Sequence, residues 1–305
     1  AFTWAPLSWP CFWPWQDAFA RALQRALPDR AGQDGLVGQI AARAQPLPSP
    51  HLSDAALHSA DSATQALRLE LQRLGRLSLE VIGQALYCPP DQIDAPLRDG
   101  PQLRQRVADN TMDSDALYRQ LVKPIWAGML QFVSRFEQPL GPRQQQHWRN
   151  SQQAAAQLVK AVKDAHALQA NLQRQLHPDN PDVIAGQAWL ELRWHLLGAL
   201  ARLRQAATAG ADIHPQHDLH TLEQQQARFE QDFSARLFAA VRQGQIDGAQ
   251  LGSLFNDLGY AKRILASLQQ VVLLGSHHRG SEDVDTDADD GWLHASGHTP
   301  AAGRR

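Results

Sequence analysis

The chain has 305 residues, 43% of them hydrophobic and 20% charged, which is enough to bury one large core or two ordinary ones. A formal net charge of −2 excludes the basic footprint that is typical of nucleic-acid-binding proteins. Cys11 and Cys88 are too few for a disulfide framework or a four-thiolate zinc site, and they suit a reducing compartment. No run approaches the roughly 18 apolar residues that cross a bilayer, so we expect a soluble or peripheral chain.

Residues 1–50 differ from the rest of the chain. The opening AFTWAPLSWPCFWPW sets four tryptophans between prolines at four-residue intervals, a spacing that excludes an α-helix. Tryptophan favours the boundary between apolar and wet surroundings, so we interpret this opening as a membrane-interface segment or, equally, as a disordered terminus. A short helix is predicted over 19–27, before Pro28, and a linker ends in PLPSP at 46–50. Because the chain begins at Ala1, we expect it to be a piece of a longer protein.

Residues 51–276 show the hydrophobic period of helices almost throughout. Six helices are predicted, over 62–86, 113–137, 143–176, 181–209, 215–243 and 247–274. Pro124 should kink the second helix, and Gly244 should end the fifth. No segment alternates with a period of two over a convincing length. The prediction is therefore an all-α antiparallel bundle of about six long helices in two runs of three.

The predicted buried stripes are clearest in the first and third helices. They consist of Leu67, Leu71, Leu74, Val81 and Ala85 in the first, and of Leu158, Val162, Ala165, Leu168 and Leu172 in the third. The last segment, 277–305, carries an acidic run among Gly, Ser and Thr and is predicted to be a disordered tail. Its histidines are interpreted as solvated tail residues rather than metal ligands; they are His277, His278, His294 and His298.

Catalytic motifs are missing from the sequence. It has no glycine-rich phosphate loop and no GxSxG, HExxH or CxxC pattern. Cys88, at a helix end before two prolines, is interpreted as a small buried hydrophobe. The nearest approach to a histidine cluster is His214, His217 and His220, which we interpret as a surface group. We therefore expect no catalytic residue, no cofactor and no enzymatic activity.

Two segments carry a family resemblance: SDAALHSADSATQALRLELQRLGRLSLEVI at 53–82 and FSARLFAAVRQGQIDGAQLGSLFNDLGYAKRIL at 233–265. With the helices between them, they resemble the C-terminal region of bacterial Na⁺/phosphate cotransporter family proteins. In that family the region is a PhoU-like bundle of two three-helix repeats. The resemblance covers about 51–275, and 17–50 is similar to the connector that follows the family's last membrane helix.

PhoU-like proteins usually carry an acidic motif of the type ND-L-E-x-x-x-D on the third helix of each repeat, and such carboxylates can hold metal ions. The matching stretches here are KDAHALQAN at 163–171 and NDLGYAKRI at 256–264. Asp164 and Asp257 keep the first acid. The later acids are replaced by His166 and Ala170 in the first stretch and by Gly259 and Arg263 in the second.

These replacements remove most of the ligands that the resemblance implies. Arg263 also puts a positive charge where a cation would bind, which is strongly unfavourable. Asp164 and His166 do not share a helix face, so they cannot make a site alone. We therefore expect no metal site, and we expect Asp257 and Arg263 to make solvated contacts or polar contacts within their own helix.

The resemblance implies a cytoplasmic regulatory or interaction domain of a Na⁺/phosphate cotransporter family protein, which serves phosphate uptake without forming the pore. Its partner would be a membrane transporter domain on the same or an adjacent polypeptide, with no nucleic acid involved and with a homodimer as a further option. It would lie at the cytoplasmic face of the inner membrane, peripheral or tethered through an upstream membrane domain. Two alternatives stay open: a free-standing PhoU-like regulator of phosphate transport and signalling, and a purely structural helical protein.

Overall fold

The computed structural model describes residues 49–89, 92–93, 101–109, 114–177, 183–208 and 215–276. Within these ranges the regular structure is entirely helical and contains no strand, which confirms the predicted all-α class. The opening of the chain, the helix predicted over 19–27 and the acidic tail lie outside the described residues.

The six predicted long helices are present with ends within a few residues of the expected ones. In chain order the elements are η1 (Asp54–His58), α3 (Ala60–Ala85), α4 (Pro101–Asp109), α5 (Ser114–Leu117), η3 (Tyr118–Val122), α6 (Lys123–Arg135), α7 (Pro142–Leu176), α8 (Val183–Thr208), α9 (Pro215–Arg242) and α10 (Gly248–Ser276). The short elements η1 and α4 were not predicted, because neither is long enough to show a hydrophobic period.

The irregularity expected at Pro124 takes the form of a π-helical turn. Segments α5, η3 and α6 follow one another without a break, and η3 is the π-helical part. The N–H group of Lys123 donates to the carbonyl of Tyr118, five residues earlier. Pro124 follows as the second residue of α6, a position where its missing N–H group costs little. The second predicted helix is therefore one helical stretch with a changed winding rather than a uniform α-helix.

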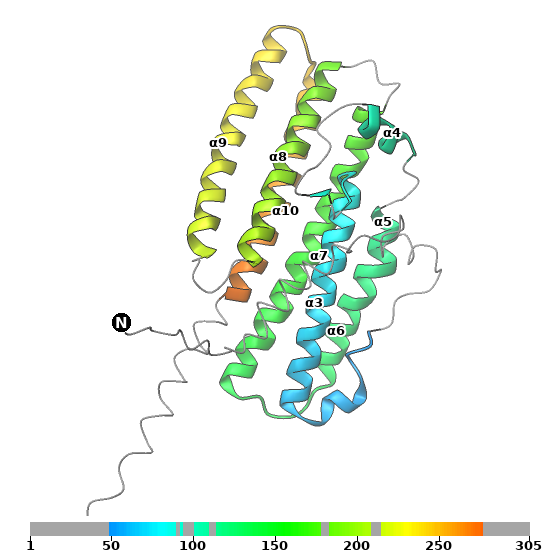
Figure 1. Cartoon of the computed structure of the whole chain (residues 1–305), viewed down its shortest axis with the longest axis vertical. Coiled ribbons are helices and arrows are strands. Elements are labelled where there is room, and N and C mark those ends of the chain that lie inside the picture. The colour runs from blue at the N-terminus through cyan, green and yellow to red at the C-terminus, as the bar shows by residue number, and fades with distance from the viewer. Residues whose placement is uncertain are drawn as a thin grey trace, which may run out of the picture.

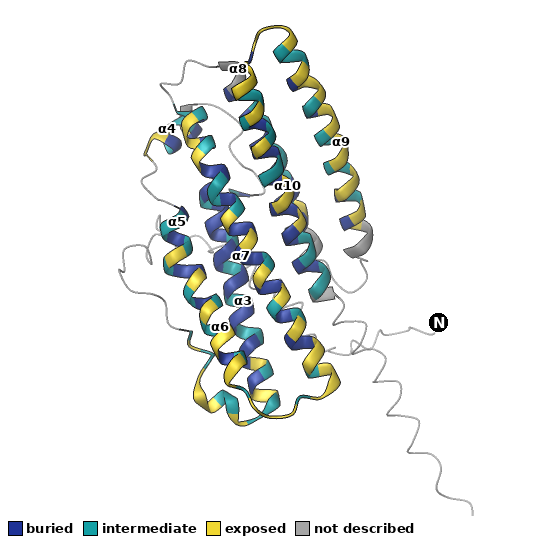
Figure 2. Ribbon diagram, turned by 180° about the vertical axis from the view of Figure 1, so that it is seen from behind, coloured by how far each residue is buried: buried dark blue, intermediate teal, exposed yellow. Residues whose placement is uncertain are grey.

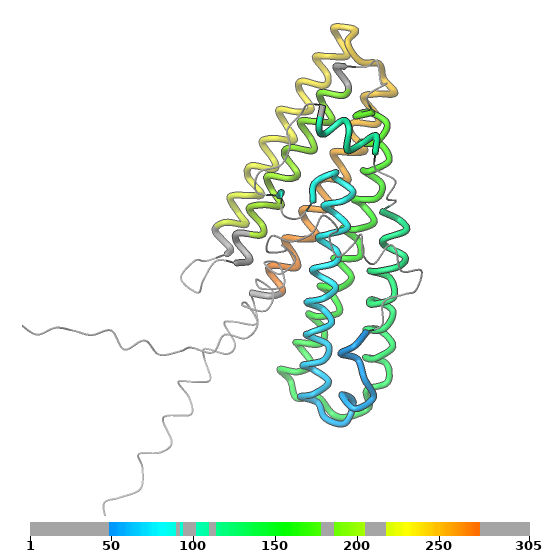
Figure 3. Tube along the Cα trace, turned by 45° about the vertical axis from the view of Figure 1, so that its right-hand side comes forward, coloured from blue at the N-terminus to red at the C-terminus, as the bar shows by residue number. Residues whose placement is uncertain are grey.

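The long helices form two halves that meet along α7 and α10. The first half consists of α3, the α5–α6 stretch and α7, and the second of α8, α9 and α10 (Figure 1). The two halves splay apart at their outer ends, while α7 and α10 cross between them (Figure 3). Within the first half α3 is the most enclosed helix, and no residue from Ala66 to Pro89 is exposed.

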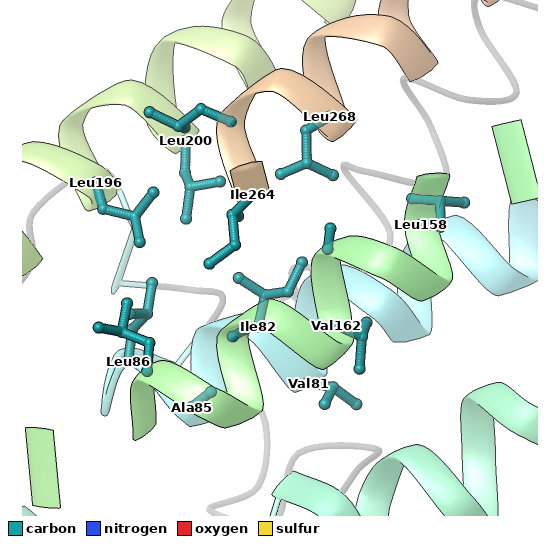
Figure 4. Packing of buried hydrophobic residues seen from close by; sticks show 14 of the residues in the cluster. Val81, Ile82, Ala85, Leu86, Leu158, Val162, Leu196, Leu200, Ile264 and Leu268 are labelled. Carbon is teal, nitrogen blue, oxygen red and sulfur yellow. The ribbon is translucent and has the colours of Figure 1, made fainter. Parts of the chain in front are cut away.

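One hydrophobic core runs through both halves. It includes every residue of the buried stripes predicted for the first and third helices. Figure 4 shows the crossing region, where Ile82 of α3 and Leu86, the residue that follows α3, approach Leu196 of α8 and Ile264 of α10. Each of these side chains is fully buried, which stabilises the fold by about 1.5–3 kcal/mol per residue relative to an exposed position. Because apolar side chains of both halves are buried against one another, the two halves share a single hydrophobic core.

Local signals define the helix ends around this core. The Ser59 hydroxyl accepts a hydrogen bond from the N–H of Ser62 at the start of α3. Asp247 and Gln250 form a reciprocal capping box at the start of α10, with hydrogen bonds of 2.7 and 2.8 Å. Gly244 follows α9 with φ at +68°, a left-handed conformation that favours glycine. Its N–H group donates to the carbonyl of Val241, which satisfies the end of α9.

We predict opposite effects for alanine at two exposed glycines. Gly244→Ala should lower the free energy of unfolding by about 1 kcal/mol, because a side chain at positive φ is strained. Gly252→Ala should raise it by about 0.5–1 kcal/mol, because Gly252 lies inside α10 with open space around its Cα. Urea unfolding of the full chain measures both, and equal shifts in the two variants would contradict the prediction.

Candidate functional site

The best-defined polar feature of the structure is the contact between α8 and the C-terminal end of α3. Arg193 of α8 is fully buried, and its Nε donates to the carbonyl of Leu86 at 2.7 Å. Its Nη2 donates to the carbonyl of Tyr87 at 3.3 Å. The last carbonyls of a helix have no partner inside the helix, and a positive charge near them is favourable. A side chain from the second half therefore completes a helix of the first.

The chain leaves α3 through a left-handed residue that is not glycine. Tyr87 has φ at +52°, and its N–H group donates to the carbonyl of Gln84 at 3.0 Å. The N–H group of Cys88 donates to the carbonyl of Gly83 at 2.9 Å, which completes a Schellman motif. Glycine is usual at this position, and a tyrosine there costs about 1–2 kcal/mol. Cys88 is buried, as the sequence predicts.

Burial affects the charge of Arg193 without removing it. Desolvation lowers the pKa of its guanidinium to about 10, while Cys88 raises the value and Arg106 lowers it further. At neutral pH the side chain is therefore still a cation, which makes its bonds to the two carbonyls charge-assisted and strong. A buried cation is costly unless it is hydrogen-bonded, so these bonds are essential to its position.

A buried carboxylate lies at the junction of α7, α8 and α10. Asp257 of α10 is fully buried, and its Oδ1 accepts a hydrogen bond from Nδ2 of Asn171 at 2.7 Å. Its Oδ2 accepts a hydrogen bond from Nε1 of Trp189, one helical turn before Arg193 on α8. Burial raises the pKa of Asp257 to about 6, while the two hydrogen bonds and the charge of Arg174 lower it. Asp257 therefore ties together three helices from both halves.

Farther along the contact between α7 and α10, Arg263 pairs with Asp164. The Nη2 and Nε of Arg263 donate to Oδ1 of Asp164 at 3.0 and 3.1 Å, and Nε also lies 3.2 Å from Oδ2. The guanidinium also lies 4.7 Å from the ring centre of Tyr260. The expectation of a solvated contact holds for Arg263, which is exposed, and was wrong for Asp257. Asp257 is buried, and the hydrogen-bond partners of Asp257 and Arg263 lie on other helices.

The other positions at which this chain lacks an acid of the family motif are His166, Ala170 and Gly259, and none of them is part of the Asp164–Arg263 pair. Nδ1 of His166 shares a hydrogen bond of 2.9 Å with the hydroxyl of Ser114, the first residue of α5. The N–H of Ser114 donates to Oε1 of Gln169 at 3.1 Å, so α7 caps the start of α5. Ala170 is exposed, and a Cβ at Gly259 would lie 3.5 Å from Nη1 of Arg263, an ordinary contact distance. The structure thus brings Asp164 and Arg263 together and places Asp257 and His166 in separate polar contacts.

No set of three or more His, Cys, Asp or Glu side chains that could hold a metal ion comes together in the described part of the chain. His220 is exposed near the start of α9, where it contacts Gln224 and Glu223. His214, the side chain of His217 and the four tail histidines lie outside the described residues. None of the helices in the described ranges combines the length and the apolar character needed to span a membrane.

Comparison with known proteins identifies no relative. No protein-family model, no curated protein and no solved structure matches this chain. The polar contacts between the halves therefore have to be interpreted from their own geometry.

Sequence reasoning did not identify Arg193, Trp189 or Asn171 as residues of this interface. One signal was available for the first of these, because Arg193 interrupts the apolar stretch AWLELRWHLLGAL of α8. A cation surrounded by buried positions needs acceptors nearby, and a helix end can supply them. Nothing in the local sequence indicates that the acceptors belong to α3.

The first prediction for this site concerns pH. The folded-state pKa of Asp257, about 6, lies above its ordinary value of 3.8, so ionisation opposes folding. Its contribution is most favourable below pH 4, and roughly 3 kcal/mol is lost as the pH rises through 6. Asp257→Asn removes this titration. The difference in unfolding free energy between variant and wild type should therefore shift in favour of the variant between pH 4 and 7, measured by urea unfolding. A difference in unfolding free energy that does not change with pH would contradict the raised pKa of Asp257.

The second prediction concerns Arg193. Arg193→Met keeps a long side chain but leaves the carbonyls of Leu86 and Tyr87 without their donor. We expect a loss of about 1–3 kcal/mol in unfolding free energy, because unpaired buried acceptors cost more than the removal of the buried charge returns. The matched control is Arg242→Met at the exposed end of α9, which should change stability by less than about 0.5 kcal/mol. Equal stability of the two variants would show that the cap is not important.

Proposed function

We propose that this chain is a non-catalytic regulatory and interaction domain of a Na⁺/phosphate cotransporter system, positioned at the cytoplasmic face of the membrane. The observation that carries the proposal is the arrangement of two three-helix halves whose third helices, α7 and α10, pack antiparallel. Two three-helix repeats are what the family resemblance implies for residues 51–275.

The contacts between the halves support a domain that acts as one body. Arg193, Asp257 and the Asp164–Arg263 pair join the halves by polar bonds, and a shared apolar core surrounds them. A domain held together in this way can transmit the effect of a partner docked on one half to the other half. Its long outer helices offer the surface for docking.

The chemistry of the replaced acidic positions supports regulation by contact rather than by a resident metal. Arg263 supplies a fixed positive charge that already pairs with Asp164. Such a pair neutralises the carboxylate without an exchangeable ion, so this part of the α7–α10 contact would not respond to metal supply. A free-standing regulator of the metal-binding type would need the carboxylates that are missing here.

The proposal is tested by phosphate uptake in the source cells. Removal of residues 51–276 should alter sodium-dependent uptake of radiolabelled phosphate and leave uptake in sodium-free medium unchanged. Re-expression of the full chain, or of its Gly252→Ala variant as a folded control, should restore the original rate. Unaltered sodium-dependent uptake would overturn the proposal.

Metal content of the purified chain separates the proposal from its nearest alternative. The docking-domain interpretation predicts protein without stoichiometric iron or zinc that co-sediments with membranes containing the transporter. Stoichiometric metal would favour an autonomous metal-binding regulator instead.

A further inference from the structure

The outer face of α9 has features of a self-association surface. Helix α9 lies at one edge of the molecule and packs mainly on α8 and α10 among the described elements (Figure 1). Its buried positions, such as Leu222, Phe233 and Leu237, all belong to the side that faces those two helices. The opposite side is a continuous exposed face along the helix (Figure 2).

The central residues of this face are uncharged. Exposed side chains recur at steps of three or four residues, which keeps them on one side of a straight helix. They are Gln224, Ala227, Gln231, Ala235 and Phe238, named here the α9 stripe. Alanines allow another helix to approach closely. Phe238 is 48% exposed, although its ring centre also lies 5.4 Å from that of Phe255 on α10. With Leu130, it is one of the large hydrophobic side chains that the described part of the chain leaves exposed.

Charged residues lie on both sides of the α9 stripe. We call the sides next to α8 and α10 the inner flanks, and the exposed side away from the ion pairs with these helices the outer flank. On the inner flanks, Glu230 pairs with Lys262 of α10, and Arg236 pairs with Glu191 of α8. On the outer flank, Arg228 and Asp232 are both exposed. Within the described residues neither of these two takes part in an ion pair. Glu230 and Arg236 are therefore paired with neighbouring helices, whereas Arg228 and Asp232, one turn apart on α9, make no ion pair with the described parts of α8 or α10.

These outward charges are complementary to themselves under a two-fold rotation. If two copies of α9 lie antiparallel with the axis near Gln231, Ala227 of each copy approaches Ala235 of the other. Arg228 of each copy then lies within one helical turn of Asp232 of the other, so the same ion pair forms twice. An isologous contact of this kind closes on itself and stops at a dimer.

We propose that the α9 stripe binds the same stripe of a second copy of this chain, in an antiparallel homodimer with its two-fold axis near Gln231. The proposal does not depend on the phosphate-related function. The contact is mostly polar and contains one aromatic side chain per copy, so the dimer should be in concentration-dependent equilibrium with the monomer.

Analytical ultracentrifugation of the full chain over a wide concentration range tests the proposal. The wild type should sediment as a monomer–dimer mixture. Ala235→Glu places a charge in the uncharged stripe twice by symmetry, and it should raise the dissociation constant at least about tenfold. The matched control is Ala127→Glu on the exposed face of α6, which should leave it unchanged. A monomer at all concentrations, or an equal effect of the two variants, would overturn the proposal.

Charge exchange identifies the partner surface. R228D and D232R should each weaken the dimer at least about tenfold, because each places like charges opposite one another. The double variant R228D/D232R should restore the affinity to within about threefold of the wild type. Thermal melting confirms that each variant is folded. Failure of the double variant to recover affinity, with all variants folded, would contradict the antiparallel arrangement.

Cross-linking shows which residues of the two copies lie side by side. Gln231→Cys places a thiol beside the proposed axis, so mild oxidation should link two copies. Gln131→Cys, at an exposed position of α6, should not link them under the same conditions. Equal cross-linking of the two variants would exclude the α9 stripe as the contact.

Discussion

The guanidinium of Arg193 determines how the two halves of this bundle fit together. It is buried and charged, and the carbonyls that stabilise it belong to the end of α3 in the other half. A buried cation tolerates little displacement from its acceptors, because the interior offers no water to replace them. The position of α8 along α3 is therefore set by this group, and apolar packing around Ile82 and Leu86 completes the contact (Figure 4).

The contact between α7 and α10 has its register defined by two further polar pairs. Asp164 meets Arg263, and seven residues later Asn171 meets Asp257. Apolar side chains alone would tolerate a shift of one helical turn, whereas such a shift would separate both pairs and leave Asp257 buried without donors. Polar groups in this core thus specify the arrangement of helices, while the apolar cluster supplies most of the stability.

The long helices were predictable from sequence because the hydrophobic period repeats many times along each of them, so a few residues that break the pattern do not hide it. The buried stripes of α3 and α7 were predictable for the same reason. The burial of Glu70 and Glu80 on α3 was not predictable, since a periodic pattern assigns acidic side chains to solvent. At Glu80 this burial raises the pKa of the carboxyl to about 7. The family resemblance singled out Asp164, Asp257 and Arg263, but their partners depend on how separate helices cross.

The cap on α3 also has a consequence for the order of folding. Arg193 and Leu86 are 107 residues apart, so the last turn of α3 leaves the ribosome long before its donor does. Bringing two such distant residues together costs chain entropy that local contacts do not, so we expect this contact to form late in folding. The left-handed Tyr87 would then be held only by its local bonds in early intermediates. The contact of the guanidinium with the end of α3 should consequently lower the unfolding rate of the finished bundle and have little influence on its folding rate.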